Sequence, residues 1–261
     1  MSIADKLNAA VGQPDYLLGR EMFRTGLTLA KVTNIKDEQN LNRVKCLPIG
    51  WADTDETDWC YVMAPMGGQE CGAFFFPQVN DLVVLAFLDG DPHRPIVLGA
   101  YWNTETKPPL TVKDGKAEEY MLRTPKKIEM KLTDTDKKQK VTLTMPSGTV
   151  LNIDDENSKV ELKDKNGDNS LTMDLKGGEI TLKAKTKLTI KAGNTSIVLE
   201  SGGNITQKGS GKISLQGTDI EGKANSKMAL QGTTTEVKAN ATLNLNASGP
   251  ANLKGAIVKI N

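Results

Sequence analysis

Aromatic side chains are missing from more than half of this chain. All twelve Phe, Tyr and Trp residues lie between Tyr16 and Tyr120, and none occurs at residues 121–261. Because compact cores draw much of their apolar area from aromatic rings, this absence excludes an ordinary globular core from the second part. We place the main boundary near residue 110, at Lys107-Pro108-Pro109.

Residue types that carry catalysis or bind metals are also scarce. His93 is the single histidine, and no G-x-S-x-G nucleophile turn is present. The three cysteines, Cys46, Cys60 and Cys71, have no CxxC spacing, so we expect buried free thiols in a reducing compartment. We therefore expect no catalytic residue, no metal site and no cofactor. A glycosidase pair of carboxylates stays open, because the chain contains 32 Asp and Glu.

Long apolar runs are absent as well. No segment reaches the roughly 20 apolar residues of a membrane-spanning helix, and the first twelve residues lack the basic and apolar regions of a secretory signal. We expect a protein that is made in the cytoplasm without a signal peptide.

What the second part contains is a short repeat. Apolar residues alternate with polar ones in pairs that recur about every eight residues, with Gly or Asn in most of the gaps between them. Alternation with a period of two predicts strands with one buried face, and a fixed short period predicts a repeat architecture. The buried positions predicted by this pattern are Ile180, Leu182, Leu188, Ile190, Ile197, Leu199, Ile213, Leu215, Met228, Leu230, Leu243 and Leu245.

Charge is unevenly placed along the chain. The formal net charge is +1 overall, but −5 at residues 1–125 and +6 at residues 171–261. The lysines of the second part fit solubility and protection of strand edges. They also fit attraction to an anionic envelope, and both interpretations stay open.

The first part has five candidate strands at 27–32, 44–47, 59–64, 82–87 and 95–100, separated by turn-rich loops. Five short strands over this length favour a small closed barrel of the OB type. Some OB barrels bind nucleic acid, which requires a basic groove. Here the longest loop, residues 51–59, is strongly acidic, so we expect no nucleic-acid partner.

Several stretches of this barrel resemble one protein family. Asn40-Leu41-Asn42-Arg43-Val44-Lys45 is similar to a family strand of the form nxxGRVkV, and residues 76–87 are similar to lPevGDeVlvaF. Residues 89–99 are similar to dGDprrPvvlGs, and residues 128–155 resemble the linking repeats of the same family. This family comprises spikes of contractile injection machines: phage baseplate assembly protein V, VgrG spikes of type VI secretion and spikes of extracellular systems. Asn42 and Asn80 stand where the family usually has Gly, and Asn tolerates left-handed backbone conformations.

The resemblance implies an all-β architecture in four segments. These are an N-terminal arm at 1–26 that docks either to a hub or to the chain's own barrel, an OB-fold barrel at 27–109, a linker with the first β-repeats at 110–159 and a triple-stranded β-helix needle at 160–261. In the family, three chains wind round one axis, so the strand edges that a single chain leaves open are paired. A single-chain β-solenoid is the alternative architecture.

The implied function is that of a structural spike without enzymatic activity. It would sit on a baseplate hub within a virion or injection particle and pierce the target cell envelope when the sheath contracts. The implied partners are two further copies of the chain, hub and tube proteins docking at Leu17, Leu18 and Phe23, and a PAAR-type tip protein, with or without an effector, at Ile257, Val258 and Ile260. A trimeric fibre that binds surface glycan is the leading alternative, and a cell-wall hydrolase is the next.

Overall fold

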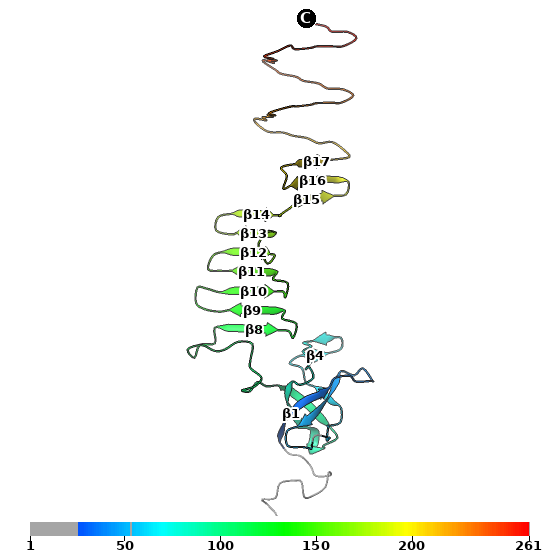
Figure 1. The fold of residues 1–261 in the computed structure, drawn as a ribbon, viewed down its shortest axis with the longest axis vertical. Coiled ribbons are helices and arrows are strands. Elements are labelled where there is room, and N and C mark those ends of the chain that lie inside the picture. Colours follow the sequence, from blue (N-terminus) through cyan, green and yellow to red (C-terminus); the bar gives the residue numbers. More distant parts are fainter. Residues whose placement is uncertain (1–25, 53, 261) are drawn as a thin grey trace, which may run out of the picture. The chain divides into compact units, whose positions relative to one another are not determined.

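The chain is built from β-strands joined by turns (Figure 1). The computed structural model describes residues 26–52 and 54–260. In this part of the chain the only helical element is a short 3-10 turn, η2 (Leu88–Gly90). The chain divides into two compact units, Met1–Thr186 and Lys187–Asn261. The predicted all-β fold class is confirmed.

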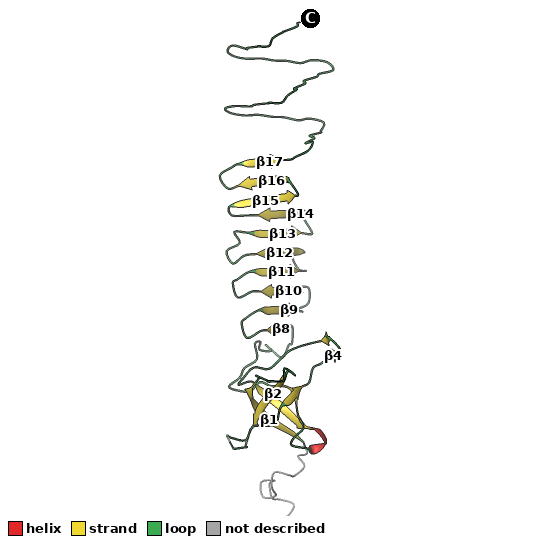
Figure 2. Cartoon of the chain, turned by 90° about the vertical axis from the view of Figure 1, so that its right-hand side faces the viewer, coloured by secondary structure: helices red, strands yellow, loops and turns green. Residues whose placement is uncertain are grey.

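Five of the first seven strands close into a barrel (Figure 2). They are β1 (Leu27–Asn34), β2 (Arg43–Pro48), β3 (Cys60–Val62), β6 (Leu82–Phe87) and β7 (Pro95–Ala100). Their order round the barrel is β1-β2-β3-β7-β6, with β3 and β7 parallel and the other pairs antiparallel. All five strands predicted from the sequence are present, and closure removes the open edges that a flat sheet would leave.

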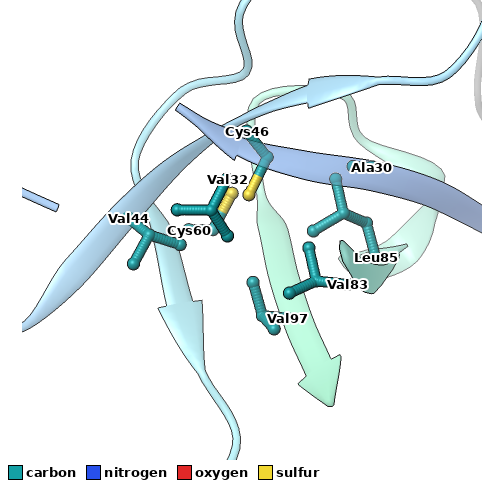
Figure 3. Close-up of a cluster of buried hydrophobic side chains, with 8 residues drawn as sticks. All are labelled: Ala30, Val32, Val44, Cys46, Cys60, Val83, Leu85 and Val97. Atoms are coloured by element: carbon teal, nitrogen blue, oxygen red, sulfur yellow. The ribbon is translucent and has the colours of Figure 1, made fainter. Parts of the chain in front are cut away.

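The barrel interior is a small cluster of aliphatic and thiol side chains (Figure 3). Alternate residues of each strand point inward because successive side chains of a strand point to opposite faces. The fully buried set is Ala30, Val32, Val44, Cys46, Cys60, Val83, Leu85 and Val97.

The expectation that all three cysteines are buried is wrong for one of them. Cys46 and Cys60 are buried, but Cys71 is exposed, and all three are free thiols. Cys71 begins β5 (Cys71–Gly72), which pairs with β4 (Gly67–Gly68) in a two-stranded hairpin separate from the barrel sheet. A hairpin with strands this short has no interior in which to bury a side chain.

Two asparagines take the turn conformation that the sequence predicted for them. Asn42 has a φ of 55° and Asn80 a φ of 77°, both in the left-handed region that glycine and asparagine adopt most easily. The replacement of the family's glycines at these positions is therefore compatible with the same turns.

Seven strands of five residues each then form one antiparallel sheet, which we call the ladder. Each strand pairs with the strands before and after it in the sequence. The ladder consists of β8 (Glu119–Arg123), β9 (Glu129–Thr133), β10 (Lys140–Thr144), β11 (Val150–Asp154), β12 (Lys159–Lys163), β13 (Ser170–Asp174) and β14 (Glu179–Lys183).

The strand register places the alternating apolar residues on one face of the ladder. They line up in two columns that run across all seven strands, because each apolar residue lies opposite an apolar residue of the next strand. The first column is Tyr120, Leu132, Val141, Ile153, Val160, Met173 and Ile180, and the second is Leu122, Met130, Leu143, Leu151, Leu162, Leu171 and Leu182.

The opposite face of the ladder carries polar and charged side chains that pair across strands. Lys131 Nζ lies 2.6 Å from Glu119 Oε1, and Lys140 Nζ lies 2.6 Å from Asp154 Oδ2. The Asp154 carboxylate also accepts hydrogen bonds from the backbone and side-chain amides of Asn157 at 3.0 and 3.1 Å. The bond from Lys140, followed by those from Asn157, lowers the pKa of Asp154 from 3.8 to about 2.

The second unit begins with another antiparallel sheet, formed by β15 (Lys187–Ala192), β16 (Thr195–Glu200) and β17 (Ile205–Lys208). Beyond it, residues 209–260 contain no strand, and the backbone runs in wide turns (Figure 1).

The strand pairing at 159–208 differs from the predicted winding of three chains, in which neighbouring strands come from different copies. Here each paired strand meets its sequence neighbours in the same chain. Short turns explain the difference. Gly193 and Gly203 have φ values of 56° and 87°, and such positive φ angles allow tight connections between antiparallel strands.

We predict that Leu85→Ala destabilises the barrel by about 2–5 kcal/mol, the usual cost of emptying a buried leucine site. Leu85 is fully buried, whereas Leu88, three residues after it at the start of η2 (Leu88–Gly90), is 44 % exposed. Leu88→Ala should therefore lower the free energy of unfolding much less. Trp51, Trp59 and Trp102 are the chain's three tryptophans, so denaturant unfolding followed by their fluorescence reports on this part of the chain. Equal losses in the two variants would contradict the assigned core.

We predict that the ladder loses stability as the pH falls from about 4 to about 2. The folded-state pKa of Asp154 is lowered, so its contribution is fully present above the unfolded pKa and is lost as the pH falls through the folded pKa. Thermal unfolding followed by circular dichroism should show a flatter pH dependence in this window for Asp154→Asn. Asp136→Asn, in an exposed turn, is the control, and an unchanged profile in Asp154→Asn would rule out this network as the cause.

Candidate assembly surfaces

The largest candidate surface is the apolar face of the ladder. Twelve of its fourteen column side chains are between 37 % and 68 % exposed in the single chain. A soluble monomer rarely leaves a contiguous apolar surface of this extent open to water. The face has the chemistry of an interface that another polypeptide covers.

Six of the predicted buried residues lie on sheets, two of them in the first unit and four in the second. Ile180 and Leu182 are the last members of the two columns, on edge strand β14. In the second unit, Leu188 lies opposite Leu199 and Ile190 lies opposite Ile197, so these four share one face of β15 and β16. The assignment of all six to the core of a trimer stays a prediction.

The other predicted interface residues do not lie on strands. Exposed fractions are 51 % for Ile213 and 74 % for Leu215, and Met228, Leu230, Leu243 and Leu245 are exposed in the same way. The predicted tip residues Ile257, Val258 and Ile260 are 78 %, 52 % and 84 % exposed. The predicted hub-docking residues Leu17, Leu18 and Phe23 lie outside the described residues.

The sequence analysis missed two apolar surfaces. The columns extend back to Tyr120, whereas the predicted buried positions begin at Ile180. The signal was available, because the same apolar alternation runs through Met130 and Leu132 and through Val141 and Leu143. The second missed surface lies on the barrel, and its signal was the run Phe74-Phe75-Phe76.

This barrel patch surrounds a cleft of about 170 Å³ next to β3. None of its lining residues is charged, and Phe74 stacks on Phe76 with 5.7 Å between ring centroids. Phe76 packs against the barrel core, whereas Phe74 and Phe75 are 71 % and 64 % exposed. The lining residues are Leu41, Asn42, Tyr61, Val62, Met63, Ala64, Ala73, Phe74, Phe75 and Phe76.

A second barrel cleft, of about 400 Å³, is polar and lies by the turn between β1 and β2. Asp37 accepts two hydrogen bonds from the Arg43 guanidinium, at 2.9 and 2.8 Å, and two more from the backbone amides of Gln39 and Leu41. The bonds from Arg43 hold the pKa of Asp37 well below its usual range. This ion pair and its amide bonds fix the turn that leads into β2.

The one tryptophan in this cleft already has cations over its ring. The Arg43 guanidinium carbon and the Lys45 ammonium nitrogen lie 5.7 and 5.6 Å from the centroid of Trp59. These separations are typical of cation–π contacts. These two cations would compete with a sugar or a base for stacking on the Trp59 ring, which argues against a glycan site here.

The remaining titratable groups of the described residues do not cluster into a recognisable catalytic or metal-binding site. His93 Nδ1 lies 2.8 Å from Asp58 Oδ2, and both side chains are mostly exposed. Among the residues that the structure describes, no group of three or more His, Cys, Asp or Glu could hold a metal ion. No helix in the same part of the chain is long and apolar enough to cross a membrane.

The barrel matches a known domain family. Residues 28–102 match the family model of the type VI secretion system/phage-baseplate injector OB domain. Family members are structural spike and baseplate proteins rather than enzymes, although VgrG chains fused to toxins exist.

Three curated proteins are similar to part of this chain. The type VI secretion system spike protein VgrG5 of Pseudomonas aeruginosa is 32 % identical over 68 residues, which are 26 % of this chain and 9 % of that protein. The actin cross-linking toxin VgrG1 of Vibrio cholerae is 29 % identical over 70 residues, 26 % of this chain and 6 % of the toxin. The spike protein VgrG1a of Pseudomonas aeruginosa is 35 % identical over 51 residues, 20 % of this chain and 8 % of that protein.

These matches cover less than a tenth of the length of each relative. The family-model match at residues 28–102 coincides with the closed barrel, whose strands span residues 27–100. Residues 28–102 of this chain are therefore an OB domain of the type VI secretion system/phage-baseplate injector family, and through that domain the chain resembles the VgrG spike proteins.

Proposed function

We propose that this chain is the structural central spike of a contractile injection particle. The observation that carries the proposal is the presence, in one chain, of an injector OB domain and a ladder with two exposed apolar columns. An OB barrel alone would leave many functions open, because one fold serves many functions. A β-ladder with one exposed apolar face favours, among these functions, that of a subunit in an assembly of several copies.

The proposed assembly is a homotrimer in which the apolar columns of three chains face one axis. Fully burying one large apolar side chain is worth roughly 1.5–3 kcal/mol, and the columns contain twelve apolar side chains that are more than a third exposed in each chain. Even partial coverage of so many side chains exceeds the usual cost of association. The polar face, with its cross-strand ion pairs, then faces water.

Residues 209–260 fit the same proposal. They keep the alternation of apolar and polar residues but form no strand within one chain. A segment with this pattern has unpaired backbone groups and an open apolar face, and both can be satisfied by winding with two further copies. We propose that this segment is the β-helix needle, with Ile213, Leu215, Met228, Leu230, Leu243 and Leu245 toward the axis.

The proposed mechanism is mechanical. The barrels sit on a hub, with Leu17, Leu18 and Phe23 as docking residues, and sheath contraction drives the needle through the envelope of the target cell. No covalent bond is made or broken. At the other end, Ile257, Val258 and Ile260 of three chains form an apolar face that a PAAR-type tip protein covers.

We predict that Leu151→Lys abolishes the trimer. Leu151 lies in the middle of the second column, so three copies would bury three ammonium groups around one axis, a cost of several kcal/mol for each unpaired charge. Asn152→Lys is the matched control, because this neighbour points to the polar face opposite Glu161. Sedimentation should give a molecular mass of about three times the chain mass of 28.2 kDa for wild type and control. A folded wild-type monomer, or a trimeric Leu151→Lys, would contradict the proposed assembly.

We predict that removal of residues 251–261 leaves the trimer intact and abolishes binding of a co-expressed PAAR-type tip protein. The reason is that the deletion removes the exposed apolar residues at the end of the chain. Affinity purification of the truncated and full-length chains measures the retained partner. If the truncated chain still retains the tip protein, the assignment of the tip is wrong.

A further inference from the structure

Cys46 and Cys60 are a pair of buried thiols that the proposed function does not use. They lie on the neighbouring strands β2 and β3, and neither side chain has any surface open to water. Both point into the barrel, where Figure 3 shows their sulfur atoms turned toward the same part of the core, beside Val32. A single buried cysteine acts as a small apolar side chain, whereas two neighbouring thiols can also react with each other.

The loop before β3 brings the two thiols together. The backbone amide of Thr57 donates a hydrogen bond to the Cys46 carbonyl oxygen at 2.8 Å, and the Cys46 amide donates one to the Thr57 hydroxyl oxygen at 3.1 Å. The same hydroxyl lies 3.2 Å from the Sγ atom of Cys60. Thr57 is itself buried, so one side chain holds the Cys46 backbone and the Cys60 sulfur in fixed places.

Hydrogen bonding makes the two thiols unequal in acidity. A hydrogen bond with the Cys60 thiol, together with burial, raises the pKa of Cys46. A hydrogen bond with Cys46 lowers the pKa of Cys60 against the effect of burial, and the Thr57 hydroxyl acts in the same direction. Because the thiolate rather than the thiol is the nucleophile, Cys60 is the member of the pair that reacts first.

The pair lies where the barrel has its shortest strand. β3 has three residues, and it contributes two paired residues to β2 and two to β7. In contrast, β1 and β6 pair over five residues, and so do β6 and β7. Segments held by few backbone hydrogen bonds open locally more often than longer ones. Such opening at β3 would admit a small uncharged oxidant to the buried thiols.

We propose that Cys46 and Cys60 form a disulfide when the protein meets hydrogen peroxide, and that this bond links β2 to β3. The Cys60 thiolate attacks one peroxide oxygen, the O–O bond breaks, and Cys60 becomes a sulfenic acid while hydroxide leaves. The Cys46 sulfur then attacks the Cys60 sulfur, and the S–OH bond breaks with release of a second hydroxide. The two thiol protons convert both hydroxides to water, and the peroxide accepts the two electrons that the cysteines lose.

The disulfide would strengthen the part of the barrel that has the fewest backbone hydrogen bonds. It closes a loop of fifteen residues, 46–60, and such a cross-link stabilises the fold by restricting the unfolded chain. Thiols stay free in a reducing compartment, so the barrel folds without the bond and acquires it on exposure to the oxidant. The bond needs only the barrel, so its formation is independent of the proposed trimer and needle.

The test uses the full-length chain with Cys71→Ser, because Cys71 is an exposed thiol that would react in place of the pair. The reduced protein is treated with hydrogen peroxide, unfolded in the presence of an alkylating agent, digested and analysed by mass spectrometry. We expect Cys46 and Cys60 to escape alkylation and their peptides to be joined. Dithiothreitol should separate the peptides.

Thermal unfolding followed by tryptophan fluorescence tests the effect of the bond. The midpoint should rise by about 10 °C after peroxide treatment and return when dithiothreitol is added. Dithiothreitol reduces disulfides but not methionine sulfoxide, so the reversal separates the disulfide from oxidised methionines. Cys46→Ala in the same background is the matched control, because it keeps Cys60 and removes its partner. Its midpoint should show no reversible rise.

Three results would overturn the proposal. The first is that both thiols remain open to alkylation after peroxide treatment, and the second is that the cysteines are oxidised singly to sulfinic acids. The third is that the peptides are joined but the midpoint does not rise, which would show that the bond does not stabilise the barrel. None of these results changes the mass of the assembly, by which the spike proposal is tested.

Discussion

The constraint on which this structure depends is the exposed apolar face of the ladder. The turns and register of β8–β14 align fourteen apolar residues in two columns, and one chain has nothing in the ladder to cover them. A sheet with one bare apolar face is soluble only when another surface packs on it. The proposed assembly, and the polar face that it would turn toward water, follow from the need to cover these columns.

The barrel, in contrast, buries its apolar side chains within one chain. Its sheet closes, so Val32, Val83 and Leu85 lose all contact with water within one chain. The Asp37–Arg43 pair fixes the turn between β1 and β2. The chain therefore joins a domain that is complete alone to a ladder that is not. Such a combination suits a part that docks at one end and is built from several copies along its length.

The barrel patch is an exposed apolar surface on a domain whose core is already complete. Phe74 and Phe75 add nothing to the barrel core, yet they lie beside Phe76, which does. Apolar side chains that remain exposed after a domain is complete have a cost in solubility, and a second interface is one physical reason to keep them.

The sequence by itself determined the strands and their faces. Period-two alternation located the five barrel strands and those at 179–200, and the absence of aromatic residues after Tyr120 separated the barrel from the repeats. Only the tertiary structure decided which strands pair, because alternation defines a face but not a neighbour. It showed pairing within one chain at 159–208, the extension of the columns back to Tyr120 and the exposure of Cys71. Register and burial depend on turn geometry and on contacts between distant residues, and a local pattern of residue types contains neither.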